Sequence, residues 1–392
     1  MKNHKCIPYV VGLCLAVSFS LQAQKFQVPG GSTGADGVLD VTQNTELPAR
    51  NDGVYNYTTI NVAAGVTLTF PRNASNTPIY LLATGDITLN GTIDVSGKAG
   101  TVLVGGLGGP GGYDGGNPGA VGMPGGNGLG PGGGHLGAGG VASEPRGAGG
   151  GSYRDQGNAV SSSTNLGSVY GGPLLIPPVG GSGGAGTIAG HGGGGGGGGG
   201  ILVCSDATIY FNSGGTIRAV GGPTISFTHN HGSGGAVRLV CRKLVGDGEI
   251  NVLGGGNGAG NGWIRIDTHD RTQFNASGSS TVPHHAVTYG SFVVARLANE
   301  PALRVLKVAG QNPPANGDPV LLPNNSASTQ TIRVEAANFG QSIQVEIALK
   351  PVNGVSTFQT VTLDNTTENP KTVDVSVEIP GNTLLHVEVY KR

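Results

Sequence analysis

The segment 79–97 reads IYLLATGDITLNGTIDVSG, and it contains the unit from which the fold is built. Apolar and polar residues alternate on both sides of the pair Asn90-Gly91, which is typical of two short strands joined by a tight turn. The polar positions are expected to face water. The side chains expected to face a core are Ile87, Leu89, Ile93 and Val95.

Two later segments repeat this unit, and each copy is expected to contain a short apolar strand, a second strand, a turn with glycine and a third short strand. Residues 201–222 read ILVCSDATIYFNSGGTIRAVGG, and residues 236–255 read AVRLVCRKLVGDGEINVLGG. A unit of about twenty residues made only of strands and turns cannot close a core alone, but copies stacked about 4.8 Å apart can. The repeat therefore predicts right-handed, parallel β-helix-like coils, with Ile93, Ile217 and Ile250 in one buried column. Several hairpins in an antiparallel sandwich remain the alternative.

Glycine is the second decisive feature. The chain has 76 glycines among 392 residues, and more than half of them lie between Thr101 and Gly200. The tract ends in an unbroken run, 192–200. From Gly105 it repeats as Gly-Gly-Leu, Gly-Gly-Pro and Gly-Gly-Tyr, a period of three that suits extended, polyglycine II-like helices bonded to one another through their backbones. A flexible, solvated glycine loop is the alternative.

The composition changes after Asn299, where six segments largely alternate apolar and polar residues between turns rich in Asn, Gly and Pro. This pattern predicts an immunoglobulin-like β-sandwich at 299–392. No segment of the mature chain shows helical periodicity, so an all-β protein is expected. The predicted organisation is a leader at 1–23, a β-helix-like domain at 24–298 with a glycine-rich insertion at 101–200, and the sandwich.

The first residues predict the destination of the protein. Lys2 and Lys5 precede an apolar stretch at 7–19, and a cleavage site follows Ala23, as in a bacterial secretory signal. No later apolar stretch reaches the roughly 18 residues that a membrane span needs. Charged residues make up only 11% of the chain and the net charge is −1, so nucleic acid is not an expected partner.

Few residues suggest chemistry. His229 and His231 lie two residues apart on an extended segment, a spacing that can hold a metal ion, and the histidines at 269 and 284–285 are further candidates. A polar loop at a coil corner explains them equally simply. Because no complete metal-binding motif is present, we expect no metal and no cofactor.

Acidic and basic residues are spread over several coils. Asp94, Arg218 and Asn251 occupy equivalent repeat positions and are expected to form an outward row, with Asp267 on a later coil. No local sequence combines a general base with a charge stabiliser and an aromatic platform, so we expect no enzyme activity. A polysaccharide lyase, a hydrolase or a glycan-binding protein that uses a coil groove is the alternative.

Two cysteines remain after the predicted leader. Cys204 and Cys241 each follow a Leu-Val strand end at nearly equivalent repeat positions. In an exported protein they could form a disulfide between stacked coils. Two buried thiols packing as small apolar groups is the other interpretation.

The order of these parts resembles a widespread group of secreted, glycine-rich bacterial proteins. The resemblance rests on the segments 82–97, 234–240, 262–266 and 305–310, and it covers nearly the whole mature chain. The Gly-Gly-x run is also similar in composition to springtail antifreeze proteins and some phage adhesins. These motifs specify no chemistry. We therefore expect a non-catalytic structural or adhesive protein of the cell surface or matrix, whose partners are surface or matrix components, with polysaccharide as one candidate.

Overall fold

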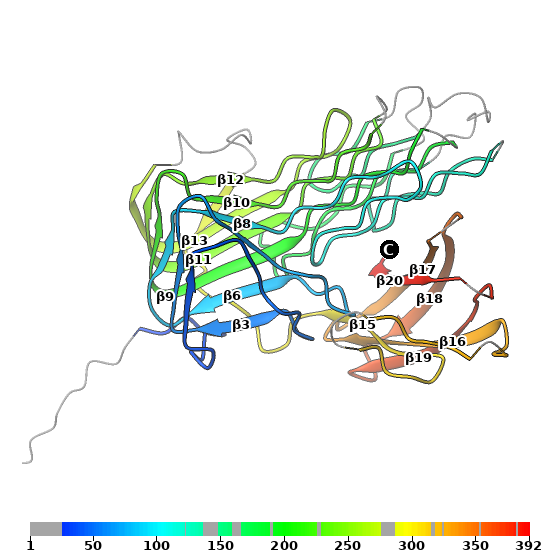
Figure 1. Cartoon of the computed structure of the whole chain (residues 1–392). Helices are drawn as coiled ribbons and strands as arrows, with labels where there is room; N and C mark the ends of the chain where they lie inside the picture. Colours follow the sequence, from blue (N-terminus) through cyan, green and yellow to red (C-terminus); the bar gives the residue numbers. More distant parts are fainter. Residues whose placement is uncertain are drawn as a thin grey trace, which may run out of the picture.

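The computed structural model describes residues 26–121, 123–135, 148–158, 166–188, 191–225, 229–275, 287–314, 318–323, 325–352, 354–381 and 383–392. Within these ranges every regular element is a β-strand, which confirms the all-β prediction. The predicted leader lies outside the described residues. Figure 1 shows three regions: coils with their strands, long extended segments that run out from the coils, and a separate group of strands, β15 to β20.

Two parallel sheets form the coils. The five-stranded sheet follows the order β12-β10-β8-β5-β2, and the nine-stranded sheet follows β1-β4-β7-β9-β11-β13-β14, with β3 and β6 joined to it through β9. The strands of the first sheet are β2 (Thr45–Glu46), β5 (Thr67–Thr69), β8 (Thr92–Asp94), β10 (Thr216–Arg218) and β12 (Glu249–Asn251). Those of the second are β1 (Val38–Val41), β3 (Val54–Tyr57), β4 (Thr59–Val62), β6 (Ile79–Ala83), β7 (Ile87–Leu89), β9 (Gly200–Phe211), β11 (Ala236–Gly246), β13 (Trp263–Phe274) and β14 (Val287–Gly290). Parallel pairing of successive repeats supports the β-helix-like interpretation over antiparallel hairpins.

The predicted isoleucine column is confirmed. Ile217 lies opposite Ile93 on one side and opposite Ile250 on the other, and Leu68 continues the row beyond Ile93. All four side chains are buried in the core between the two sheets. Residues separated by more than a hundred positions therefore stack directly, because the glycine-rich tract leaves and re-enters the coils between β8 and β9.

One detail differs from the predicted repeat. The first copy breaks into β6 and β7 at Thr84-Gly85-Asp86, whereas in the later copies the two expected strands are fused into the long strands β9 and β11. The segment Ser205-Asp206-Ala207 contains no glycine or proline, so nothing in it ends the strand. The chain instead bends with a shift in the β9–β11 register between Cys241 and Lys243.

The glycine-rich segments lie side by side and bond through their backbones. The nine-glycine run is surrounded by other segments of the chain. Its successive N–H groups donate in turn to three of these segments. Gly193, Gly196 and Gly199 donate to residues of segment 95–101, Gly194, Gly197 and Gly200 to segment 110–116, and Gly195 and Gly198 to segment 230–233, at 2.8–3.0 Å. The direction thus repeats every three residues, which is the period seen in the sequence.

These contacts leave no room for side chains. A Cβ atom on Gly195 would lie 1.8 Å from the carbonyl oxygen of Gly222, and one on Gly197 would lie 2.0 Å from that of Gly181. Both distances are far below a van der Waals contact. Backbone lies directly against backbone, and this close approach is the physical reason for the composition.

The C-terminal strands form two antiparallel three-stranded sheets around a second core. One sheet has the order β15-β16-β19 and the other β18-β17-β20, and their inward residues include Ile332, Val334, Val345 and Ile347. All six predicted strands are present. Their bounds are β15 (Ala302–Val308), β16 (Thr329–Ala337), β17 (Ser342–Pro351), β18 (Thr357–Asp364), β19 (Lys371–Glu378) and β20 (Leu385–Lys391).

Candidate functional site

The histidine pair does not form a metal site among the described residues. The Nδ1 atom of His231 accepts a hydrogen bond from the backbone N–H of Thr224 at 3.0 Å, so in the neutral ring the other nitrogen carries the proton. The Nδ1 atom of His229 is buried without a partner. Burial, followed by the neighbouring His229, lowers the pKa of His231. No group of three potential metal-binding side chains occurs in the described ranges, from which residues 284 and 285 are absent. His269 packs edge-on against Phe26 instead.

Cys204 and Cys241 are free thiols. In the register of β9 and β11, Cys204 lies opposite Val240, and Cys241 lies opposite Ser205. The two cysteines are therefore offset by one residue and point to opposite faces of the sheet. Cys241 lies in the core between the sheets, and Cys204 lies in the apolar cluster on the outer face. Burial raises the pKa of both thiols.

The expected outward row of Asp94, Arg218 and Asn251 exists, and it lies on the exposed face of the five-stranded sheet. Arg218 lies opposite Asp94 and Asn251 on the five-stranded sheet. The Nε atom of Arg218 is 4.0 Å from Oδ2 of Asp94, and about half of the arginine side chain is exposed. Surface ion pairs of this kind contribute little. The row has the geometry of a solvated coil face.

Asp267 is separated from that row, because it belongs to the nine-stranded sheet. Its carboxylate accepts hydrogen bonds from Arg238 Nε at 3.1 Å and from Arg265 Nη2 at 2.7 Å. Arg238 and Asp267 are almost fully buried, and Arg238 also donates to the carbonyl oxygen of Val294 at 2.9 Å. This cluster fastens the segment 291–296 over the sheet, and the segment in turn covers the cluster. The structure therefore does not bring Asp267 together with the adjacent pair Asp94 and Arg218.

A charge cluster that the sequence did not reveal joins the glycine-rich segments to the sandwich. Asp114, fully buried, pairs with Lys350 at 3.1 Å, with Arg72 and with Nδ1 of His386 at 3.4 Å. Arg72 also bonds Oε1 of Glu388 at 2.8 Å. The one available signal was that Asp114 is the sole charged residue between Gly105 and Gly134. Its partners are distant in sequence, so their convergence could not be inferred.

The two carboxylates of this cluster differ in their protonation. Burial alone would raise the pKa of Asp114, but the charges of Lys350 and Arg72 outweigh it and hold that pKa well below its ordinary value. Burial and the nearby charge of Asp114 raise the pKa of Glu388 to about 7, with Arg72 opposing the change. The Oε2 atom of Glu388 is buried and has no hydrogen-bond partner.

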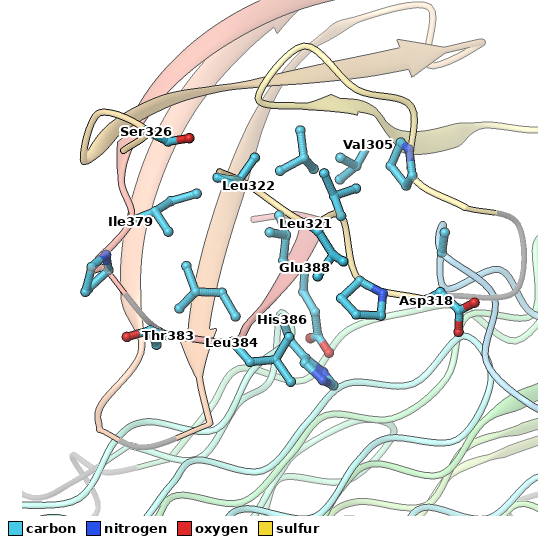
Figure 2. A pocket seen from close by; sticks show the side chains of 18 of the residues that line it. Val305, Asp318, Leu321, Leu322, Ser326, Ile379, Thr383, Leu384, His386 and Glu388 are labelled. Carbon is cyan, nitrogen blue, oxygen red and sulfur yellow. The ribbon is translucent and has the colours of Figure 1, made fainter. Parts of the chain in front are cut away.

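A cavity of about 600 Å³ lies against this cluster. Figure 2 shows His386 and Glu388 pointing toward the glycine-rich ribbons, with Leu321 and Leu322 on the sandwich side. The walls of this cavity are largely apolar. Most of the charged side chains at the base of the cavity already form ion pairs with one another. The arrangement can exchange a proton near neutral pH at Glu388, and its ion pairs link the sandwich to the glycine-rich segments.

The far end of the glycine-rich segments carries exposed apolar side chains. The turns there lie side by side, since Gly100 N–H donates to Pro223 O at 2.9 Å and Gly193 N–H donates to Thr101 O at 2.8 Å. Figure 1 shows these segments doubling back away from the coils. Val121 is 92% exposed and Leu103 72%. We call this set the tip surface; it consists of Val102, Leu103, Val121, Met123 and Ile225.

Comparisons with protein-family models, with curated proteins and with solved structures found no match for this chain. In the part of the chain that the structure describes, no helix has the length and apolar character to cross a membrane.

Proposed function

We propose that this protein is a secreted, non-catalytic structural or adhesive component of the bacterial surface or extracellular matrix. In this proposal the coils are a right-handed β-helix, the glycine-rich segments form a polyglycine II-like bundle, and the sandwich is an immunoglobulin-like domain. The resemblance to secreted glycine-rich bacterial proteins supports the same assignment.

The observation that carries the proposal is the glycine-rich bundle. Its core consists of peptide groups bonded to one another, a material suited to stiffness and unsuited to acid–base chemistry. It holds the tip surface away from the coils (Figure 1). Exposed apolar residues that are grouped together are characteristic of interaction surfaces. The bundle would therefore act as a rigid arm that presents its tip to another surface.

Two measurements test this proposal. Fractionation of the producing cells should place the protein outside the cytoplasm. Beads coated with purified protein should bind an apolar-coated surface, and the double variant Leu103→Ser, Val121→Ser should weaken that binding by at least about tenfold, since losing some 1.4 kcal/mol of apolar contact gives that factor.

Val38→Ser is the matched control. Val38 is 69% exposed but lies in β1 at the edge of the nine-stranded sheet. Its variant should adhere like the original protein. Equal losses in the control and the tip variant, or a cytoplasmic location, would contradict the proposal. Turnover of a polysaccharide that is lost on changing Asp94, Arg218 or Asp267 would favour the enzyme alternative.

A further inference from the structure

We propose that a second cavity, between the coils and the sandwich on the side of Arg296, binds a uronic acid residue of a polysaccharide. The cavity has a volume of about 720 Å³, within the roughly 300–1,000 Å³ of small-ligand pockets. Its walls come from the segments 74–80, 296–305 and 387–392, with contributions from the glycine-rich tract. We call it the Arg296 cavity. It is separate from the tip surface, and the inference does not depend on adhesion through the tip.

The guanidinium group of Arg296 is the central observation. It lies over the ring of Tyr80, with 4.7 Å between Cζ and the ring centroid. Its Nε atom is buried and has no hydrogen-bond partner, and the side chain forms no ion pair with any described residue. An unsatisfied buried donor is costly. The two terminal nitrogens of the guanidinium can donate two parallel hydrogen bonds to one carboxylate, a geometry that arginine favours and lysine cannot provide.

Glu300 is a carboxylate of the cavity lining that binds other donors. Glu300 accepts a hydrogen bond from the Tyr80 hydroxyl at Oε2, 2.8 Å away, and another from the backbone N–H of Leu297 at Oε1, 3.1 Å away. The ring of Tyr80 therefore supports the guanidinium, and its hydroxyl binds the carboxylate of Glu300. The charge of Arg296 remains available to a ligand.

The remaining charges of the cavity favour an anion. Asp52 accepts a hydrogen bond from the backbone N–H of Val54 at 3.0 Å, and Glu388 is paired with Arg72. Arg304 and Lys391 also line the cavity, and neither forms an ion pair within the described residues. Arg392 lines the cavity as well, so its four cationic side chains outnumber the three carboxylates of Asp52, Glu300 and Glu388 by one.

The apolar walls suit a sugar ring. Tyr113 and Tyr390 form an edge-to-face pair with ring centroids 5.3 Å apart, and Phe339, Pro131 and Pro177 complete the lining. The C–H face of a pyranose can pack against such rings while its carboxylate reaches a guanidinium. A bare inorganic anion would leave these apolar walls without contacts. A uronic acid uses both halves of the cavity.

The test is isothermal titration calorimetry on the full chain with three probes: trigalacturonate, the neutral trisaccharide galactotriose, and sodium sulfate. Trigalacturonate should bind, with an affinity that falls as salt is added. Arg296→Met should weaken this binding by at least about tenfold, and Arg296→Lys should restore only part of it, because charge returns without the planar fork.

Arg242→Met is the matched control, because Arg242 is an exposed arginine on β11 that does not line the cavity. It should leave the affinity unchanged, and thermal unfolding should show that all variants remain folded. Absence of trigalacturonate binding would overturn the inference. So would equal affinity for galactotriose, sulfate binding as tight as that of trigalacturonate, or an Arg296→Met affinity like that of the control. The tip surface is intact in these variants, so such a failure would leave the proposed adhesion standing.

Discussion

Replacing Gly197 by alanine should test the backbone packing of the glycine-rich bundle directly. The new Cβ would lie 2.0 Å from the carbonyl oxygen of Gly181 and 2.3 Å from its carbonyl carbon. Ordinary contacts between such atoms are about 3.5 Å. The obstacle is main chain rather than a side-chain end, so relief requires the two segments to separate by 1 Å or more.

The magnitude follows from the hydrogen bonds that such a separation strains. Gly197 N–H donates to Tyr113 O at 2.8 Å, Gly109 N–H donates to Gly197 O at 2.9 Å, and Gly181 N–H donates to Gly198 O at 2.8 Å. Each buried bond left unmade costs about 1–2 kcal/mol, so the three together give about 3–6 kcal/mol. The entropy that alanine removes from the unfolded chain offsets only about 0.4–1 kcal/mol.

Gly172→Ala is the control for this substitution. A Cβ at Gly172 would meet no atom within 4 Å, and the residue does not have a left-handed conformation. This variant should unfold at the same urea concentration as the original protein or slightly higher. Unfolding can be followed by the fluorescence of Trp263, the only tryptophan in the sequence, which begins β13 in the coils. Free energies of unfolding that agree within about 0.5 kcal/mol for the two variants would refute the packing argument.

Three further results are expected. Ile217→Ala should lower the free energy of unfolding by about 2–5 kcal/mol in urea titrations, because it truncates the buried column, whereas Thr216→Ala on the outer face should change it little. Comparable small effects would mean that the register is wrong. The folded-state pKa of Glu388, about 7, lies above its ordinary value of 4.5, so the native protein retains a proton that the unfolded chain releases, and stability should fall by about 3 kcal/mol as pH rises from 4.5 to 7. Glu388→Gln should flatten this part of the profile, and an unchanged slope in a series of thermal melts would contradict the assignment. Asp267→Asn should cost about 3–5 kcal/mol, because it leaves Arg238 buried without its counter-charge, and limited proteolysis should then cut first within 291–296. Preferential cleavage elsewhere would argue against the proposed clamp.

The parts of the fold that could be predicted were those in which apolar and polar residues alternate along a short segment. The positions of Ile93, Ile217 and Ile250 follow from counting residues within each repeat, and the strands of the sandwich follow from their period of two. In both β9 and β11 a single long strand replaces two expected strands, because a strand break was expected where the sequence has no residue that imposes one.

The charge cluster could not have been found in the same way. Asp114 meets Arg72 and Lys350 because the glycine-rich tract folds back against the sandwich, and no local pattern encodes that docking. Cys204 and Cys241 illustrate a second limit. An offset of a single residue between adjacent strands reverses the face to which a side chain points. Cys204 and Cys241 are offset by one residue in the pairing of β9 and β11.

The nine-glycine run cannot specify its own alignment. In an ordinary sheet a slip of one residue exposes the core, but in a stretch of identical residues it would change no side chain at all. The alignment information must come from outside, where Ile201 directly follows the run and pairs with Ile79 and Val237 in the coils. The strand pairing in the coils therefore sets the alignment of the glycine-rich segments. During folding, the arm should acquire a unique structure only after the coils that anchor it have formed.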